Sequence, residues 1–442
     1  MSIDKIVSLC KRRGFIFQSS EIYGGFGAVY DYGPLGIALK NNISQLWWKS
    51  MTQLHENIVG LDSGILMHPR IWEASGHVGA FNDPLVDCKQ CKARYRADEF
   101  GEGKIEDVNW DQIQCPKCGT KGNLTEPRQF NLMFKTNIGP IEEDANVAYL
   151  RPETAQGIYV NYLLTQNAMR LKVPFGIAQI GKAFRNEIVA RNFIFRTREF
   201  EQMEMQYFVK PGTDDASMKD WKEERMSFYG KLGIDSGKLR FHEHGSNELA
   251  HYAKEAWDIE FEFPFGWSEI EGIHNRTDFD LVRHQEFSGK KMEIFDQGNN
   301  ERFIPYIIET SAGLNRILLT VLSDAYWEDI ENNRVVMKLH PRIAPVTAVV
   351  CPLVKKDGLP ELGREVMDIL KPKFKVIYDQ QGSIGKRYYR QDEAGTPFGI
   401  TIDHQSKDDN NVTLRNRDTQ KQERVAIDQL LNAINENIGD YS

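Results

Sequence analysis

The stretch from Gly176 to Val209, GIAQIGKAFRNEIVARNFIFRTREFEQMEMQYFV, predicts a long antiparallel hairpin. Its two ends, residues 176–184 and 198–209, read as strands, and the loop between them is rich in Arg and Asn. Neighbouring strands joined by one ordered loop pair antiparallel. The hairpin therefore favours a fold that is built around an antiparallel sheet.

The second strand of this hairpin alternates in character with a period of two residues. Met203 and Met205 fall on one face, whereas Gln202 and Glu204 fall on the other. We expect the methionine face to join the core and the opposite face to form the floor of a polar pocket.

Charged and aromatic side chains of the loop extend this pocket. Arg185 and Glu187 leave the first strand, and Phe195 lies in the loop. An Arg side chain can hold a phosphate oxygen and neutralise the charge that develops when the phosphorus is attacked, and a Phe ring can stack on adenine. The combination is suited to ATP. The alternative is a surface hairpin whose Arg and Glu residues pair across the strands.

A second candidate phosphate site is the sequence Glu-Thr-Ser-Ala-Gly-Leu-Asn-Arg at 309–316. The apolar run 303–308 predicts a strand that ends at Glu309, and apolar residues recur at helical spacing from Leu314 onward. Arg316 would then lie in the first turn of a helix, where the positive end of the helix dipole favours a triphosphate tail. Ordinary packing of small residues at a strand-to-helix junction is the alternative.

Four cysteines form two Cys-x-x-Cys pairs, Cys88 with Cys91 and Cys115 with Cys118. This spacing is typical of a four-cysteine zinc ribbon, and we expect a structural Zn²⁺. Two disulfides are the alternative, disfavoured in a reducing compartment. The isolated Cys10 and Cys351 read as buried thiols.

The composition is that of a soluble protein with more than one domain. The chain has 442 residues, of which 41% are hydrophobic, and a net charge of −8, which is unusual for a protein that binds nucleic acid. Binding depends on local patches, however, and residues 182–198 and 386–390 are basic and aromatic enough to contact a phosphate backbone; a solvated charged face is the alternative for the second. Neither the apolar run at 6–10 nor that at 344–354 matches a secretory signal or a membrane span. We expect a cytoplasmic protein with no membrane partner.

The two stretches described above and Arg-Pro-Glu-Thr-Ala-Gln-Gly at 151–157 resemble the signature motifs of class II aminoacyl-tRNA synthetases. The motifs at 151–157 and 309–316, with Phe-Asn-Leu-Met-Phe at 130–134, closely resemble the dimeric glycyl-tRNA synthetases. Residues 68–77 are similar to the end of that family's first motif, with Pro69 as its proline, a motif that contributes to the dimer interface. The resemblance covers nearly the whole chain and implies a homodimer.

The resemblance implies an α+β fold with two domains. A class II catalytic domain with an antiparallel sheet would occupy residues 1–340, with a zinc-ribbon-like insertion at 82–128 and a helical insertion at about 211–260. An α/β anticodon-binding domain would occupy 341–442, after the prolines at 341 and 345. Its expected elements are strands at 347–351, 375–378, 398–402 and 412–415 and helices at 361–370 and 427–434. The candidates for contacts to tRNA are Lys386, Arg387, Arg390, Arg415 and Arg417.

The activity that the resemblance implies is the ligation of glycine to tRNA(Gly). Glycine's carboxylate attacks the α-phosphorus of ATP, pyrophosphate leaves, and the adenylate passes its glycyl group to the terminal ribose of tRNA. Such a reaction needs positioning and charge stabilisation and no covalent nucleophile of the enzyme. The implied catalytic residues are Arg185, Glu187 and Arg316.

By the same resemblance Arg185 would contact the α-phosphate, Phe195 would stack on adenine and Arg316 would reach the ATP tail. Glu187 and Glu269 are the candidates for holding Mg²⁺, and the sequence leaves open which of them does. The implied ATP site comprises Arg185, Asn186, Glu187, Phe195, Arg196, Thr197, Arg198, Glu199, Phe200, Glu269, Ile270, Gly313, Leu314, Asn315 and Arg316. The implied glycine site comprises Arg96, Glu153, Phe200, Glu201, Gln202, Met203, Glu204, Glu309, Thr310, Ser311, Ala312 and Gly313.

Recognition of glycine requires acidic groups for its ammonium and walls that leave no room at the α-carbon. The resemblance places Glu153, Glu309 and Ser311 around these atoms. Every competing amino acid is larger, and steric exclusion discriminates better than a pocket that must reject a missing methylene. No editing domain is then required.

Two other functions are compatible with such a scaffold. A catalytically idle relative would only bind nucleic acid, and a related ligase would activate another small acid without tRNA. The presence of Glu153, Arg185 and Arg316 disfavours the first, and the C-terminal α/β pattern disfavours the second.

Overall fold

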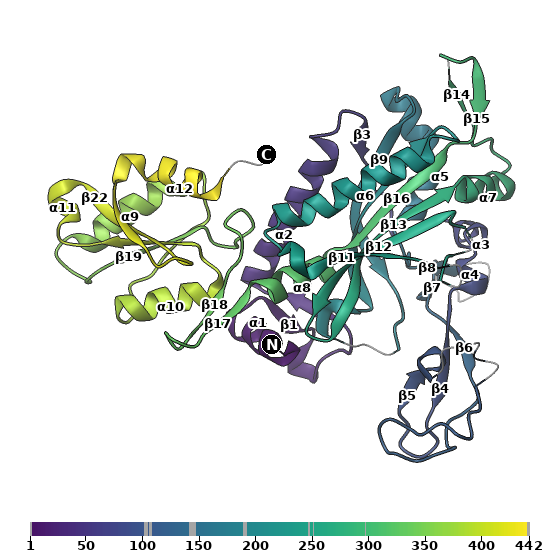
Figure 1. Cartoon of the computed structure of the whole chain (residues 1–442), viewed down its shortest axis with the longest axis horizontal. Coiled ribbons are helices and arrows are strands. Elements are labelled where there is room, and N and C mark those ends of the chain that lie inside the picture. Colours follow the sequence, from purple (N-terminus) through teal and green to yellow (C-terminus); the bar gives the residue numbers. More distant parts are fainter. Residues whose placement is uncertain are drawn as a thin grey trace.

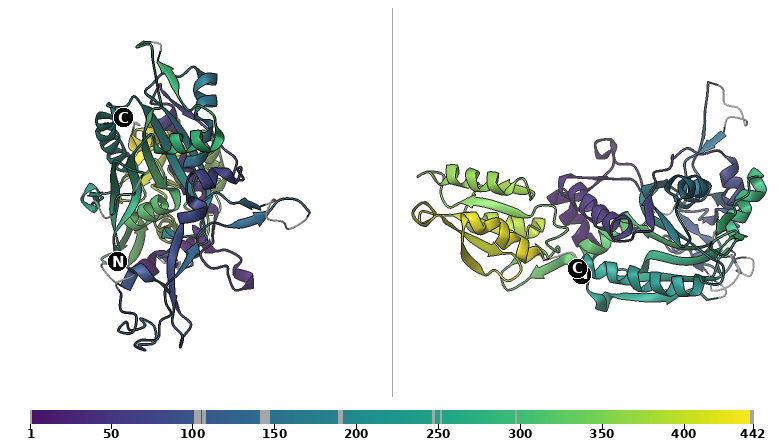
Figure 2. Two further views of the ribbon diagram at one scale, coloured as in Figure 1. Left: turned by 90° about the vertical axis from the view of Figure 1, so that its right-hand side faces the viewer. Right: turned by 90° about the horizontal axis from the view of Figure 1, so that it is seen from above.

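The computed structural model describes residues 2–100, 105, 108–140, 147–188, 192–245, 248–250, 252–296 and 298–439. Parts of the predicted segments lie outside the described residues: 101–104, 106 and 107 of the zinc-ribbon-like insertion, 141–146, 189–191 of the hairpin loop, 246, 247 and 251 of the helical insertion, and 440–442 at the C-terminal end. The molecule is elongated, with a large sheet and its helices toward one end and a smaller sheet toward the other (Figures 1 and 2).

A seven-stranded sheet forms the centre of the larger part. All neighbouring strands are antiparallel except the edge pair β3 and β9, so the predicted antiparallel sheet is confirmed. In spatial order the strands are β11 (Leu239–Glu243), β12 (Glu255–Phe263), β13 (Gly266–Thr277), β16 (Tyr306–Gly313), β10 (Glu199–Val209), β9 (Phe175–Phe184) and β3 (Ile58–Gly60).

Helices pack on both faces of this sheet, but they leave part of one face open. On the first face Met203, Met205 and Ile308 join a continuous apolar core with four helices. On the second face two helices pack around Phe175 and Phe208. The first group is α1 (Ile3–Arg13), α2 (Pro34–Thr52), α6 (Asp214–Lys231) and α8 (Leu314–Ala325), and the second is α5 (Ala155–Met169) and α7 (Phe279–Ser288).

The predicted hairpin is present as β9 and β10, with ends within one residue of those expected. The alternation is also confirmed. Met203 and Met205 are fully buried in the core, whereas Gln202 and Glu204 face a polar cavity on the opposite side.

The strand before α8 differs from the prediction. The sequence predicts a strand over 303–308 that ends at Glu309, but β16 runs on to Gly313 before α8 begins at Leu314 as expected. Glu309 and Ser311 continue the ladder with β10, opposite Gln206 and Glu204. The polar residues therefore belong to the strand, and their side chains furnish its cavity face.

The segment 211–260, predicted as a helical insertion, contains a long helix and contributes outer strands to the large sheet. The helix is α6, from Asp214 to Lys231. It packs on the sheet with Trp221 and Tyr229 in the main core. The rest of the segment supplies β11 and part of β12, the outer strands of the sheet.

A small sheet projects from the larger part between β3 and α5 in the sequence (Figure 1). It contains β4 (Asn82–Asp87) between β5 (Arg94–Arg96) and β6 (Arg128–Asn131). These strands lie within the predicted insertion or at its end.

The C-terminal part contains a five-stranded sheet of mixed direction. The expected strands and helices are present with small shifts of their ends, and the sequence missed β23, α10 and α11. The elements are β20 (Val376–Tyr378), β19 (Ala348–Pro352), β21 (Phe398–Ile402), β22 (Asn411–Asn416), β23 (Gln422–Ala426), α9 (Leu359–Leu370), α10 (Ile384–Ala394), α11 (Ser406–Asp409) and α12 (Leu430–Ile438).

Buried charges join the two parts where the hairpin of β17 (Tyr326–Asp329) and β18 (Arg334–Met337) meets α10. Asp392 of α10 pairs with Arg334 of this hairpin and accepts two hydrogen bonds from Arg415 at 2.8 and 3.0 Å. All three residues are buried. Removal of one partner from such an enclosed cluster would leave a buried charge uncompensated, so the pairing favours the observed contact between the hairpin and α10.

Candidate active site

A polar cavity of about 220 Å³ lies on the part of the second face of the large sheet that α5 and α7 leave uncovered. The loop after β9, the cavity faces of β10, β13 and β16 and the first turn of α8 enclose it. The described residues that line it are Glu153, Arg185, Glu187, Ile194, Phe195, Arg196, Thr197, Phe200, Gln202, Glu204, Tyr252, Glu269, Gly272, His274, Arg276, Glu309, Ser311, Gly313, Asn315 and Arg316.

Arg185 is held between two aromatic rings at the cavity wall. Its guanidinium carbon lies 5.2 Å from the ring centroid of Phe81 and 5.3 Å from that of Phe200. Its Nε donates to the carbonyl oxygen of Pro152 at 3.1 Å. Cation–π contacts and one anchored nitrogen restrict the side chain, and no hydrogen bond to another described residue is found for its remaining N–H groups, which could bind a phosphate.

Arg316 covers the ring of Phe195 in the same cavity. The guanidinium carbon is 4.4 Å from the ring centroid, and Nη1 lies 2.9 Å from the Glu269 carboxylate. Nε donates to the carbonyl oxygen of Phe195 at 3.3 Å. Phe263 and Phe265 meet Phe195 edge-on, so the ring is fixed in orientation.

Three carboxylates from three separate elements meet at another part of the cavity. Glu204 and Glu309 are buried on β10 and β16, and Glu153, before α5, has a side chain that is 17% exposed. Gln206 bridges two of them, since its Nε2 donates to Glu204 at 2.8 Å and to Glu309 at 2.9 Å. Three carboxyl groups that are enclosed so close together favour a cationic ligand, because a cation would balance their negative charge.

The environment separates the pKa values of these carboxyls. Burial raises the pKa of Glu153, but the charges of His77 and Arg276 outweigh it and lower the value to about 2. Burial also opposes ionisation of Glu309, yet Arg276 and a hydrogen bond from His274 at 2.8 Å hold its pKa below the ordinary value.

The pKa of Glu204 moves in the opposite direction. Burial raises it well above the ordinary value, and the negative charges of Glu309 and Glu153 raise it further. Of the three carboxyls, Glu204 is therefore the one whose pKa a bound cation would lower most directly.

Most of the sequence-predicted site residues come together in this cavity. Those that line it are Arg185, Glu187, Phe195, Arg196, Thr197, Glu269, Asn315 and Arg316 of the ATP set, Glu153, Gln202, Glu204, Glu309 and Ser311 of the glycine set, and Phe200 and Gly313, which are predicted for both.

The other predicted residues lie outside the cavity lining. Met203, Ile270, Ala312 and Leu314 belong to the core on the opposite face of the sheet, and Thr310 is buried as well. The alternation of the strands turns these side chains away, so only their backbone atoms could meet a ligand.

Charged residues of the predicted sets also point elsewhere. Glu201 pairs with Lys40 at 2.7 Å and Glu199 pairs with Lys182, both beside a neighbouring hollow. Arg198 donates to the carbonyl oxygens of Glu187 and Gly27, so it holds loops in place. Asn186 likewise ties its loop to the Leu132 carbonyl oxygen through its backbone N–H, at 2.7 Å.

Arg96 lies in the projecting small sheet, outside the lining. It pairs with Asp83 at 2.9 Å and with Asp98 at 2.6 Å. Its charge nevertheless acts on Glu187, whose pKa is raised by burial and lowered in part by Arg196, Arg185 and Arg96. Arg94 is bound to Asp87 and has no such link among the described contacts.

Sequence reasoning missed five lining residues, namely Ile194, Tyr252, Gly272, His274 and Arg276. Three of them share one face of β13. The period-two pattern at 272, 274 and 276 was available in the sequence, but His and Arg at this spacing also fit a solvated strand face. Tyr252 and Ile194 lie in loops that give no such signal.

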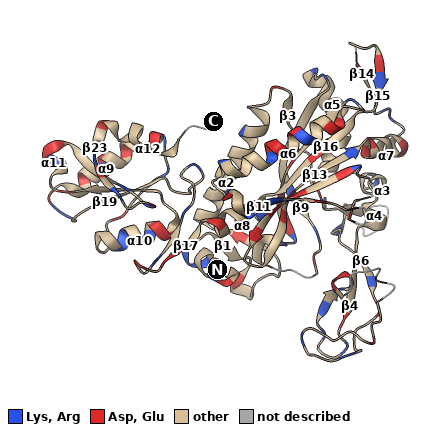
Figure 3. Ribbon diagram, viewed as in Figure 1, with Lys and Arg blue, Asp and Glu red and all other residues tan. Residues whose placement is uncertain are grey.

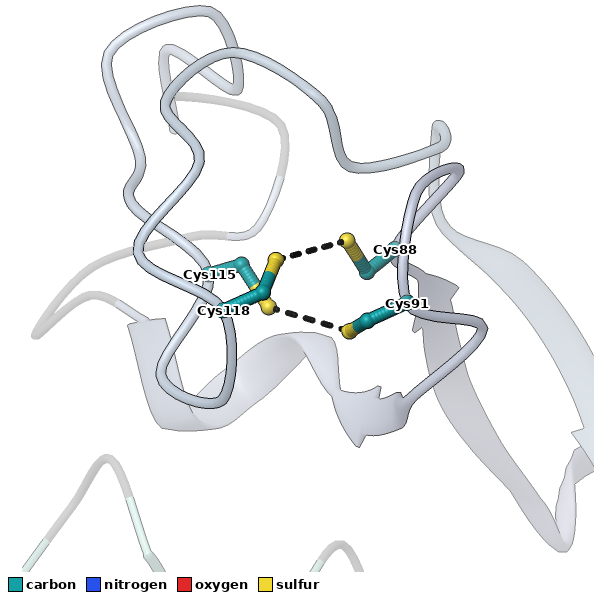
Figure 4. A group of neighbouring side chains, drawn as sticks. All are labelled: Cys88, Cys91, Cys115 and Cys118. Carbon is teal, nitrogen blue, oxygen red and sulfur yellow. Dashed lines mark hydrogen bonds between the residues drawn. The ribbon is translucent and has the colours of Figure 1, made fainter.

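The four paired cysteines converge in the projecting part (Figure 4). The sulfur atoms of Cys88 and Cys118 are 3.7 Å apart, as are those of Cys91 and Cys115, and all four lie within 4.8 Å of one another. Four sulfurs around one zinc ion at about 2.3 Å in a tetrahedron would be about 3.8 Å apart. The arrangement therefore fits Zn²⁺, and it is too wide for the disulfide alternative.

Three of the predicted tRNA contacts are wrong, because the side chains are buried in the C-terminal part. Arg387 donates to the carbonyl oxygens of Pro352 and Gly382, Arg415 is bound to Asp392, and Arg417 donates to the carbonyl oxygens of Leu339 and Gly395. Each satisfies internal acceptors.

Two of the predicted contacts remain at or near the surface. Arg390 is partly exposed and paired with Asp379, and Lys386 is exposed. Figure 3 shows both signs of charge along α10, so this helix is not uniformly basic.

Comparison with known families defines the class of protein. Residues 134–325 match the tRNA synthetase class II core domain (G, H, P, S and T), and residues 347–437 match the anticodon binding domain. The antiparallel sheet with its basic and acidic cavity is thus the core of a class II aminoacyl-tRNA synthetase. No helix in the described part is both long and apolar enough to span a membrane.

Relatives define the family within that class. The chain is 60% identical to a glycine–tRNA ligase of Treponema denticola, over 100% of this chain and 98% of the relative. It is 54% identical to a glycine–tRNA ligase of Borrelia hermsii, over 99% and 98%, and 52% identical to one of Chlorobaculum tepidum, over 96% and 97%. The chain belongs to the glycine–tRNA ligase family.

Proposed function

We propose that this chain activates glycine with ATP and transfers the glycyl group to tRNA(Gly). The observation that carries the proposal is a single cavity in which a basic and aromatic region, around Arg185 and Phe195, adjoins a cluster of three carboxylates. The first suits a nucleotide triphosphate and the second suits an ammonium group. Membership of the family supports the same reaction.

In this proposal Arg185 binds the α-phosphate and stabilises the charge that develops during attack. Its place between Phe81 and Phe200 keeps it extended into the cavity. Phe195 stacks on adenine, and Arg316 contacts the rest of the nucleotide from the first turn of α8. Catalysis then depends on positioning and electrostatics.

Glycine's ammonium binds among Glu153, Glu204 and Glu309, and its carboxylate faces the α-phosphate. Ser311 lies beside this cluster, where its hydroxyl accepts a hydrogen bond from Gln202 at 3.1 Å. In this proposal the residues around the ammonium group exclude a side chain on the α-carbon, which would account for selection of the smallest amino acid without editing.

Magnesium accompanies the ATP, and Glu269 and Glu187 are the acidic residues placed to hold it. Both line the cavity beside the arginines. Two protein carboxylates are enough for Mg²⁺, because phosphates and water supply most of its ligands when it accompanies a nucleotide.

Zinc has a structural role in the projecting part. The four sulfurs enclose it away from the cavity, and a closed four-cysteine set leaves no coordination position for a substrate. The ion would hold the strands that carry Arg96 near the entrance of the site.

The C-terminal part, proposed as residues 341–442, recognises the anticodon region of the tRNA, with Lys386 as the remaining exposed candidate on α10. We also propose a homodimer with the segment at 68–77 in the interface. The resemblance of this segment to the family's first motif supports this interface. Such a protein works in the cytoplasm, together with its tRNA.

Glycine-dependent exchange between ATP and pyrophosphate tests the activation step. We expect exchange with glycine and none with alanine or serine, and charging of tRNA(Gly) by the same preparation. No exchange with any amino acid would identify an idle relative. Exchange without charging would identify a ligase that does not use tRNA.

A further inference from the structure

Asp280 lies behind the cavity and connects two of its carboxylates. It is in the first turn of α7, is 2% exposed, and is not among the described lining residues. Its oxygens accept hydrogen bonds from Nε and Nη2 of Arg276 at 2.8 and 3.1 Å and from Nε2 of Gln156 at 3.1 Å. The helix N-terminus stabilises its negative charge.

Each partner of Asp280 reaches one carboxylate of the proposed ammonium site. Gln156 donates with the same Nε2 to Glu153 at 3.0 Å. Arg276 places Nη1 3.3 and 3.4 Å from the two oxygens of Glu309. Glu153 and Glu309 lie far apart in the sequence, and Asp280 is the group that both chains of contacts share.

Arg276 lies closer to Asp280 than to Glu309. Its guanidinium donates hydrogen bonds of 2.8 and 3.1 Å to Asp280, whereas its distances to the oxygens of Glu309 are 3.3 and 3.4 Å. A register shift between β13 and β16 at Asn275 and Thr277 leaves Arg276 without a paired residue across the ladder, and such bulges redirect a side chain. The Tyr252 ring, 4.0 Å from the guanidinium carbon, flanks the cation.

We propose that Asp280 is a positioning residue for substrate selection: it holds Arg276 back from Glu309 and, through Gln156, fixes Glu153, so that both carboxylates stay available for the ammonium group. Without the charge of Asp280, the nearest anion for Arg276 is Glu309. A closer pairing there would neutralise the carboxylate that should receive glycine. The inference rests on the proposed function.

The test is Asp280→Asn, which preserves size and removes the charge. In ATP–pyrophosphate exchange we expect the KM for glycine to rise at least tenfold and the KM for ATP to change less than twofold. The matched control is Asp214→Asn. Asp214 is also 2% exposed in the first turn of a helix and binds a cation, Lys254 at 2.9 Å. It accepts a hydrogen bond from the Asn275 side chain at 2.7 Å, but among the described contacts it meets neither Arg276 nor any of the three carboxylates. It should leave both KM values unchanged.

A second variant separates positioning from general support of the fold. In Asp280→Asn with Arg276→Met the misdirected cation is gone. Because Arg276 also lowers the pKa of Glu153 and Glu309, we expect the KM for glycine in this double variant to match that of Arg276→Met alone, whereas a purely structural role predicts that the two defects add. The comparison with Arg276→Met also carries the test if Asp280→Asn alone does not fold, because Arg276 is then not left buried without its main partner.

Three results would overturn the inference: an unchanged KM for glycine in Asp280→Asn, equal increases in both KM values, or failure of both variants to fold. An inactive wild type would instead overturn the proposed function. The two failures are therefore distinguishable in one set of assays.

Discussion

The guanidinium of Arg316 lies 4.4 Å above the ring of Phe195, on the face where an adenine would stack. This separation leaves no space for another ring between them. In the proposed site, an adenine that stacks on this face of Phe195 would therefore displace Arg316 from the ring and from Glu269.

Replacing the ring tests this arrangement. Phe195→Leu should raise the KM for ATP by about 5- to 100-fold, since base stacking on an aromatic side chain contributes ~1–3 kcal/mol. The KM for glycine should change little. Phe241→Leu, at a partly exposed ring on the edge strand β11, is the control. An unaltered KM for ATP would mean that adenine binds elsewhere.

Arg185→Ala should reduce exchange by about 10²- to 10³-fold, the loss typical of one preorganised group that stabilises developing charge. The fold should persist, because the side chain makes one hydrogen bond to the backbone and no described ion pair. Circular dichroism and thermal unfolding check the fold. Arg240→Ala, which removes an exposed pair with Glu260, should leave exchange intact. Near-normal exchange in Arg185→Ala would refute the role of this residue.

Glycine binding should release protons from the enzyme. The pKa of Glu204 is raised by burial and by Glu309 and Glu153, so the group is protonated over a wider pH range than an ordinary Glu. An ammonium group beside it favours the ionised form and lowers this pKa, so affinity for glycine should increase as the pH rises toward the raised value.

Titration calorimetry in two buffers of different ionisation enthalpy measures this release. Wild-type protein should release up to one proton per glycine, and Glu204→Gln should show no dependence on the buffer. Proton uptake by the wild type would contradict the assignment.

Removal of the metal should loosen the projecting part while leaving the large sheet folded. Metal analysis of purified protein should find one zinc per chain, and Cys115→Ser should lose it, since thiolate ligands supply the binding energy. Cys10→Ser, at an isolated buried thiol, should retain the ion. A wild-type protein that contains no metal would refute the zinc site.

Asp392→Asn should separate activation from tRNA charging. It leaves Arg334 and Arg415 buried without a charged partner, at a cost of about 3–5 kcal/mol. The C-terminal part should unfold at a lower denaturant concentration, and charging should fall more than exchange. Asp368→Asn, which removes a surface pair with Lys371, should cost less than about 0.5 kcal/mol. Equal loss of both activities would show that the ion cluster supports the whole chain.

Much of the fold could be predicted because its signals are local. The alternation at 202–206 places two methionines in the core and three polar residues on the cavity face, as the structure has them. The end of β16 was missed for the opposite reason. In the sequence, Glu309 looks like the end of a strand, because a charged residue follows an apolar run. Its place within β16 is explained by pairing with β10, which the sequence does not reveal.

The site shows the same division between local and long-range information. Motif residues such as Arg185 and Glu309 were found, whereas Asp280 and Arg276 act through contacts between β13, α7 and α5 that no spacing reveals. Charge alone also led to wrong predictions for three arginines. Arg387, Arg415 and Arg417 were interpreted as ligands for tRNA, but burial makes them internal donors.

The different character of the two faces of β10 has a consequence for the fraction of folded molecules that are active. A shift in the register of this strand by one residue would turn its methionines toward the cavity and its carboxylates into the apolar core. A chain with this register could not form its core, so it would not persist as a folded but inactive protein. Molecules that complete folding should thus be uniformly competent, and a titration of active sites should approach the protein concentration.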